Sequence, residues 1–392
     1  MNNRQAMRRA VWISSVLLAA TLHAQSVSPR HSLDHAALAK KIIERLDMKE
    51  GETFLAVAHP GLFDEMIPYL RYEAMRVGAV DLGVLDVLAQ PVPESFSEET
   101  LRTGAEASLP RLREMLQGVD ASVMLPGANP GQPAYTAIQD LLRDGKGRTI
   151  HFHWLENGSA LPLPGQPLPP RHVIEATYQR ALLDADYEAL GAHQRRFVAA
   201  MRKGEVRVTS PAGTDLRFRI GDRPVNVQDG NASMARTEAG RILIDREIEL
   251  PAGAVRVAPL EETVHGTIAF PPSQWAGRPV QGLKLVLEAG RVVSLSAESG
   301  EEAVRRELED AGAGGGSFRE MALGFHPMLA VPQESPWIPY YGYGAGVVRL
   351  SLGDNSELGG NVTGGYVRWN FFVDTTLSVG GEVWIRDGAL VR

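Results

Sequence analysis

Short apolar runs alternate with longer amphipathic segments between Leu33 and Ala200. Short apolar runs bounded by polar or turn residues predict buried strands, and apolar positions at a spacing of 3.6 predict helices. Strands are predicted at 53–58, 79–85, 121–125 and 148–153, and helices at 62–77, 97–116, 134–142, 174–183 and 187–201. A proline-rich connector, 161–170, precedes the last two helices. Strands that alternate with helices indicate a mainly parallel α/β sheet.

The pattern changes to a period of two from Glu205 onward. Alternation on both sides of the Ser210-Pro-Ala-Gly213 turn predicts a hairpin. Further strands are expected at 263–270, 282–288, 291–296, 346–352 and 371–379, with a helix at 301–310 and a final hairpin at 381–388. We therefore predict an α/β domain over 25–203, followed by a β-rich α+β domain over 204–392.

The first residues have the pattern of a secretory signal peptide. Arg4, Arg8 and Arg9 precede an apolar run, and Leu22-His-Ala24 offers a small-residue cleavage site. The run is too short for a transmembrane helix. We predict a signal peptide over 1–24 and an exported protein, periplasmic or extracellular. A short amphipathic anchor helix is the alternative.

Composition narrows the classes of partner and chemistry. The formal charge of −7 argues against nucleic acid or an anionic membrane as the main partner. The chain has no cysteine, which excludes thiol catalysis, zinc–thiolate sites and disulfides. With 44% hydrophobic residues, a chain of this length can bury an ample core without covalent cross-links.

Three ordered motifs mark the last fifth of the chain. They are Phe-Arg-Glu-Met-Ala-Leu-Gly at 318–324, Gly-Val-Val-Arg-Leu-Ser-Leu-Gly at 346–353 and Arg-Trp-Asn at 368–370. They resemble the Gly-Glu…Gly, Gly-Thr-Val-His-x-Ala-x-Gly and His-Trp-Asp signatures of the aminopeptidase T family of two-metal exopeptidases. Upstream, 250–268 resembles that family's Pro-x-Gly-Glu-Val-Phe-Thr-Ala-Pro…Gly-Thr-Ile segment. The resemblance extends over about 205–392 and implies an aminopeptidase T-type domain there.

The resemblance also implies which residues stand at the metal positions. The family uses two glutamates, two histidines and an aspartate, and their places are held here by Ala254, Glu320, Arg349, Arg368 and Asn370. Alanine has no donor atom, and a guanidinium has no lone pair to give to a metal. We predict no working two-metal centre, no catalytic residue and no cofactor. In this hypothesis the charges of Arg349 and Arg368 replace the metals, with Glu320 as their counter-ion.

Several functions remain open at this point. The chain is a non-catalytic homologue that binds a small anionic or peptide ligand through Glu320, Arg349, Arg368 and Asn370, or these residues form only a structural ion cluster. The alternative is an active metal-dependent aminopeptidase or hydrolase. Its zinc, cobalt or manganese would be held by His265, Glu320 and His326, with Glu261 and Glu262 nearby. A third reading is a partner-binding subunit and homodimer, because the related enzymes associate through this domain.

The first half offers three histidines and no nucleotide or nucleophile motif. His59 follows a predicted strand, and α/β folds often bind ligands at such positions. His151 and His153 are two apart on a strand, so their side chains share a face and could share a metal. The simpler interpretation is a pair of strand histidines. The sequence contains no phosphate loop, no Gly-x-Ser-x-Gly elbow and no dinucleotide fingerprint.

Overall fold

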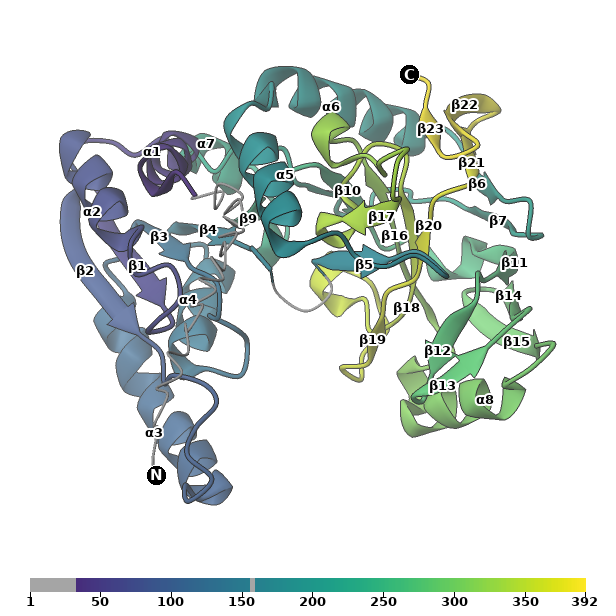
Figure 1. Ribbon diagram of the computed structural model, residues 1–392, viewed down its shortest axis with the longest axis horizontal. Helices are drawn as coiled ribbons and strands as arrows, with labels where there is room; N and C mark the ends of the chain where they lie inside the picture. The colour runs from purple at the N-terminus through teal and green to yellow at the C-terminus, as the bar shows by residue number, and fades with distance from the viewer. Residues whose placement is uncertain (1–32, 156–158) are drawn as a thin grey trace, which may run out of the picture. The chain divides into compact units, whose positions relative to one another are not determined.

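The computed structural model describes residues 33–155 and 159–392 (Figure 1). The predicted signal peptide, 1–24, lies outside the described residues. Within the described residues, no helix has both the length and the apolar character needed to cross a bilayer.

The first half forms the predicted parallel sheet. Its strand order is β2-β1-β3-β4-β9, and every neighbouring pair is parallel. The strands are β1 (Thr53–Ala58), β2 (Val80–Asp86), β3 (Ala121–Met124), β4 (Arg148–Phe152) and β9 (Glu247–Leu250). The helices of this half are α1 (His35–Leu46), α2 (Ile67–Arg76), α3 (Glu98–Leu116), α4 (Pro133–Arg143), α5 (Arg171–Leu183) and α6 (Tyr187–Lys203).

Strand β1 shows why helices cover both faces of this sheet. Phe54, Ala56 and Ala58 belong to the cluster that includes the buried side chains of α1 and α2. Leu55 and Val57 point the other way and join the cluster formed with α3 and α4. Because successive side chains of a strand alternate between faces, an unbroken apolar run needs a partner layer on each side.

The second half contains two antiparallel sheets. The eight-stranded sheet has the order β15-β14-β11-β7-β6-β21-β22-β23, and the other runs β19-β18-β16-β10-β8, with β20 also on β18. The strands of the first sheet are β6 (Val206–Thr209), β7 (Asp215–Phe218), β11 (His265–Ala269), β14 (Lys284–Glu288), β15 (Arg291–Ser296), β21 (Thr376–Val379), β22 (Glu382–Arg386) and β23 (Ala389–Leu390). Those of the second are β8 (Asn226–Val227), β10 (Ala254–Val257), β16 (Phe318–Gly324), β18 (Val348–Gly353), β19 (Val367–Arg368) and β20 (Phe371–Phe372).

Short elements complete this half. They are the hairpin β12 (Ser273–Trp275) and β13 (Arg278–Val280), the helices α7 (Met234–Glu238) and α8 (Glu301–Asp310), and the 3-10 turns η1 (Leu243–Asp245), η2 (Glu261–Thr263), η3 (Gly312–Gly314), η4 (Pro327–Leu329), η5 (Tyr340–Gly342) and η6 (Ser356–Leu358). The expected fold class, a parallel α/β region followed by a β-rich region, is confirmed.

Three local features differ from the predicted pattern. The proline-rich connector contains β5 (Ala160–Pro162), which pairs with β17 (Trp337–Pro339). The single strand expected at 371–379 is two strands, because β20 pairs with β18 and β21 pairs with β6 in the other sheet. Strand β9 comes from beyond residue 203 yet completes the parallel sheet beside β4. The predicted domain boundary stays a prediction.

Candidate functional site

One face of the β10, β16 and β18 sheet carries charged side chains deep inside the protein. In the antiparallel register, Ala322 lies opposite both Arg256 of β10 and Arg349 of β18, and Glu320 lies opposite Ser351. Directly opposed residues project to the same face. The register therefore brings Arg256, Glu320 and Arg349 together, whereas Met321 and Leu350 point into the apolar core.

Glu320 is the centre of this cluster. Its side chain has 0% exposure, and its carboxylate lies 3.1 Å from Nη2 of Arg256 and 2.8 Å from Nη2 of Arg349. The Ser351 hydroxyl donates to the same carboxylate at 3.3 Å. The predicted pairing of Arg349 with Glu320 is present, and Arg256 is a partner that the motif comparison missed.

A second arginine and a second carboxylate enlarge the cluster. Neighbouring residues of a regular strand point to opposite faces. The register of β16 shifts between Phe318 and Glu320, so the side chains of both Arg319 and Glu320 can reach the cluster. Glu357, from η6, accepts from Nη2 of Arg256 at 2.7 Å and from Nη2 of Arg319. We call Arg256, Arg319, Glu320, Arg349 and Glu357 the ion cluster.

The charges decide the ionisation of Glu320. Burial opposes ionisation of this carboxyl group, but the guanidinium groups of Arg256, Arg349 and Arg319 outweigh that cost and hold its pKa well below its usual range. The Glu320 carboxyl group therefore stays ionised across the physiological range. Its carboxylate oxygens accept from arginines rather than facing an open cavity.

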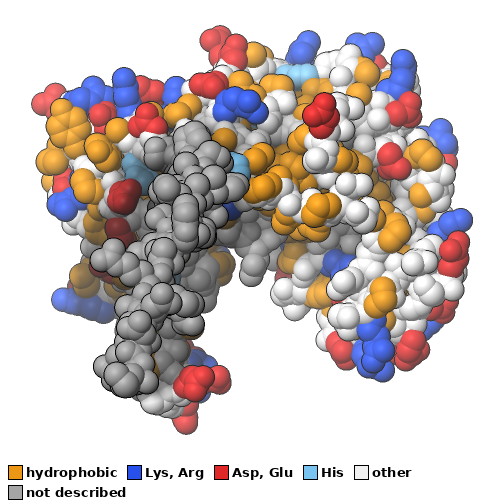
Figure 2. Space-filling model, in the orientation of Figure 1, with side chains coloured by type: hydrophobic (Ala, Val, Ile, Leu, Met, Phe, Trp, Pro, Cys, Tyr) orange, Lys and Arg blue, Asp and Glu red, His pale blue; other side chains and the backbone are white. Residues whose placement is uncertain are grey.

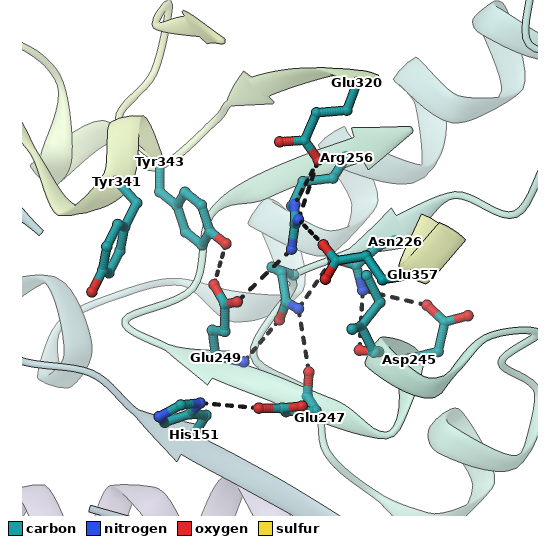
Figure 3. A network of polar contacts seen from close by, with 12 residues as sticks. His151, Asn226, Asp245, Glu247, Glu249, Arg256, Glu320, Tyr341, Tyr343 and Glu357 are labelled. Carbon is teal, nitrogen blue, oxygen red and sulfur yellow. Dashed lines mark hydrogen bonds and ion pairs between the residues drawn. The ribbon is translucent and has the colours of Figure 1, made fainter. Parts of the chain in front are cut away.

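A polar network continues from the ion cluster to the parallel sheet (Figure 3). Glu249 of β9 lies 4.0 Å from Nη1 of Arg256 and accepts from the Tyr343 hydroxyl. The side-chain amide of Gln228 accepts from the backbone N–H of Glu249 at 2.8 Å and donates to the carbonyl of Glu247 at 3.3 Å. Strand β9 thus connects the parallel sheet to the sheet of β10, β16 and β18 both through side-chain contacts and through the backbone that continues into β10.

Glu247 and His151 form the far end of this network. Nδ1 of His151 is 3.0 Å from the Glu247 carboxylate, which also accepts from Tyr135 at 2.8 Å and Gln139 at 3.0 Å. Burial opposes ionisation of Glu247, yet these hydrogen bonds lower its pKa to about 2. The rings of His151 and His153 are 3.7 Å apart, as expected for residues sharing a strand face.

Arg368 and Asn370 lie outside the ion cluster. Arg368 is bound to Glu307 of α8 at 2.6 Å and to the carbonyl of Gln274 at 2.7 Å, and its guanidinium lies 3.4 Å from the ring centroid of Trp275. Its Nε donates to Asn370 at 3.1 Å. The expectation that Glu320 is the shared counter-ion of Arg349 and Arg368 is therefore wrong for Arg368. The acidic partner comes from a helix that the motif does not include.

Arg368, Trp369 and Asn370 line a groove of about 710 Å³ together with the proline-rich 161–166 segment and the 269–274 loop. Hydrophobic side chains gather on the face over β5 and β17 (Figure 2). The Trp369 ring also lies over Arg349, with the guanidinium 4.8 Å from its centroid. Trp369 thus stands between the groove and the buried Arg349.

The alternative metal ligands are not assembled. His326 is buried, its Nδ1 accepts from the Met328 N–H, and its Nε2 donates to the carbonyl of Ala181. His265 is on the eight-stranded sheet, and its Nε2 donates to the carbonyl of Glu262. Among residues 33–155 and 159–392, no group of three or more histidine and acidic side chains converges as a metal site would.

Glu261 and His59, the other candidate ligand-binding residues, also have partners within the protein. Glu261 binds Arg223 and accepts from Asn355 at 3.1 Å. His59 accepts from the N–H of Gln90 through Nε2 at 2.7 Å. These partners account for the burial of both side chains without a ligand.

Comparison with known protein families and solved structures identifies proteins that this one resembles. Residues 185–329 match the family described as thermophilic metalloprotease (M29). This match lies mainly in the β-rich half and supports the resemblance to the aminopeptidase T family that the motifs indicate. No curated protein matches the sequence. The fold is similar to AmpT from Thermus thermophilus, with a TM-score of 0.60 and 20% identity, over 91% of this chain and 99% of that one.

The same fold occurs in a protein of different chemistry. The 2,5-dihydroxypyridine dioxygenase from Pseudomonas putida KT2440 matches with a TM-score of 0.62 and 13% identity, over 91% of this chain and 96% of that one. At these identities the likeness shows the fold alone. The chemistry of this protein therefore depends on its own side chains and does not follow from the fold.

Sequence reasoning missed Arg256, Arg319 and Glu357. Arg256 lies between Val255 and Val257 in an apolar strand, and a charged residue in such a run needs a buried partner. That signal was available in the sequence. The register shift at Arg319 and the contact of Glu357 with the buried arginines produce no local pattern in the sequence.

Replacing Glu320 with glutamine should destabilise the protein strongly. The amide keeps the size of the side chain but leaves Arg256 and Arg349 buried without their shared carboxylate, and breaking a buried ion pair costs about 3–5 kcal/mol. Urea unfolding followed by circular dichroism measures this loss. Glu301→Gln, which breaks an exposed pair with Arg305, is the control and should change little. Equal stability of Glu320→Gln and wild type would contradict the described cluster.

Acidification should destabilise the fold through His326. Burial lowers the pKa of His326 to about 4 from 6.5, because the charged imidazolium loses its hydration there, and the hydrogen bond to the Ala181 carbonyl offsets only part of this cost. Between these values the unfolded chain binds the proton and the folded chain does not, so stability falls as pH falls. The full difference is on the order of 3 kcal/mol. Unfolding free energies of wild type and His326→Gln should converge between pH 6.5 and 4, and a parallel pair of curves would refute this. His265→Gln is the exposed control.

Proposed function

We propose that this protein is a non-catalytic relative of the aminopeptidase T family. The observation that carries the proposal is the buried carboxylate of Glu320, held between Arg256 and Arg349 at 3.1 and 2.8 Å. By motif order, Glu320, Arg349, Arg368, Asn370 and Ala254 occupy the family's ligand positions. A fixed set of ions then stands where the metals would be.

The donor chemistry of these positions supports the proposal. Two divalent cations need several anionic or neutral donors that converge and leave a place for water. Glu320 is the one carboxylate of the five positions, and its oxygens already accept from guanidinium groups and Ser351. A divalent cation beside Arg256, Arg319 and Arg349 would also be repelled by like charge. These residues do not fit a two-metal centre, so we derive no hydrolytic step through one.

The role we propose is binding of a small anionic ligand, such as a free carboxylate or the C-terminal carboxylate of a peptide. Guanidinium groups hold carboxylates through charge-assisted hydrogen bonds, and a desolvated site strengthens them. Arg368 is an unfavourable anchor, because Glu307, Gln274 and Asn370 already accept from its nitrogens. Arg349 lies beneath Trp369. The anion-binding capacity therefore has to be sought elsewhere in the ion cluster.

Purified full-length protein should contain no stoichiometric zinc, cobalt, manganese or iron by mass spectrometry. It should also release no amine from aminoacyl substrates beyond a mock purification, with or without added metal, because the donors of the centre are missing. Tightly bound metal at one or two equivalents, with hydrolysis that a chelator abolishes, would establish the alternative of an active metal-dependent aminopeptidase.

We also propose export, on the basis of the basic and apolar pattern of the first residues. Expression of the full chain in a bacterial host followed by fractionation should place the protein outside the cytoplasm. Amino-terminal sequencing should then begin at Gln25. Recovery of a chain that starts at Met1 or Asn2 from the cytoplasmic fraction would refute both the export and the cleavage site.

A further inference from the structure

Glu357 differs from the other acidic residue of the ion cluster in its exposure. Its side chain is 42% exposed, whereas the guanidinium-bearing side chains that it contacts, Arg256 and Arg319, are 7% and 3% exposed. Glu320 is entirely buried between Arg256 and Arg349. One anion of the cluster is thus a fixed part of the core, and the other reaches it from the surface.

The charge balance requires an anion at the position of Glu357. Without it, three guanidinium groups, Arg256, Arg319 and Arg349, would face Glu320 and the more distant Glu249. Arg319 depends on Glu357 most, because Glu320 is 4.0 Å from its Nε. Within the described part of the chain, that buried Nε has no hydrogen-bond partner. A second carboxylate oxygen at this position could accept a hydrogen bond from the Nε–H of Arg319.

The chain around Glu357 is anchored independently of its carboxylate. Leu358 is fully buried against Ile244 and Ala258. Asn355 has no exposure, donates to Glu261 at 3.1 Å and accepts from the N–H of Val362 at 2.8 Å. The backbone of η6 can therefore stay in place while the Glu357 side chain rotates outward, since the contacts that fix the turn belong to its neighbours.

We propose that Arg256 and Arg319 form a carboxylate-binding site and that Glu357 is its built-in, displaceable occupant. The site takes a small carboxylate, whose two oxygens match the convergent N–H groups of two guanidiniums. In the protein at rest, Glu357 supplies one such oxygen to both arginines (Figure 3 shows its approach to Arg256). An incoming carboxylate replaces it and releases it to solvent.

This inference deepens the proposed function, because it names the group that an anionic ligand would meet. It also gives a reason for keeping two arginines buried at this point. Replacement of a buried charge cluster by apolar residues is often neutral or stabilising, so stability alone is a weak reason to retain one.

Chemical rescue of Glu357→Ala tests the site. The variant vacates the carboxylate position without changing Arg256 or Arg319, and its thermal midpoint should lie below that of wild type. Sodium acetate should raise the midpoint of the variant by about 2 °C or more over sodium chloride at the same ionic strength, through binding to the folded state. Wild type should show a smaller difference than the variant, because acetate has to displace Glu357 from the position before it can bind.

Two further variants sharpen the result. Glu382→Ala is the matched control, because Glu382 has 45% exposure and pairs at 2.6 Å with Arg392, whose side chain is exposed. It should show no acetate-specific shift. Glu357→Gln should also show none, because its amide fills the space that acetate needs. An equal shift in all four proteins, or none in Glu357→Ala, would overturn the proposal.

The outcome stays informative if Glu357→Ala does not fold by itself. Refolding from urea in acetate but not in chloride would then support the site, and failure in both would refute it. Neither outcome depends on metal content or peptidase activity. An acetate-insensitive variant of a metal-free protein would leave the non-catalytic assignment standing and remove only the anion site.

Discussion

A carboxylate with no access to water can remain ionised only if the protein supplies the solvation that water would have given, and Glu320 imposes that requirement. Arg256 and Arg349 approach it from the strands on either side of β16. The antiparallel register sets these distances, so the register and the charges support one another. A one-residue slip of β10 would turn Arg256 into the apolar core and leave Glu320 with Arg349, Ser351 and the more distant Arg319.

The relationship to known proteins shows how little a fold dictates about chemistry. This chain shares its fold with AmpT from Thermus thermophilus and with a 2,5-dihydroxypyridine dioxygenase, at TM-scores of 0.60 and 0.62. The motif positions carry Ala254, Glu320, Arg349, Arg368 and Asn370, and neither an alanine nor a guanidinium has a lone pair to give to a cation. The fold alone therefore does not determine the chemistry of this protein.

The sequence predicted the features that have a local signature. Periodicity located β1, β3, β4 and α8 closely, and the motif order brought Glu320 and Arg349 to one site. The pairing of Arg368 with Glu307 could not be predicted, because α8 meets β19 only through tertiary packing. Arg319 was hidden by a shift in strand register, and β5, β9 and β17 by their shortness and their distant partners.

Strand β9 ties the amino-terminal and carboxyl-terminal halves of the chain together. It lies in the parallel sheet beside β4, and after Pro251, Ala252 and Gly253 the same backbone becomes β10 of the antiparallel sheet. A cut after residue 203 would deprive the amino-terminal piece of its edge strand and leave β9, in the carboxyl-terminal piece, without its neighbour β4. The halves are therefore interlocked rather than modular, and neither is expected to be exchanged, shuffled or inherited without the other.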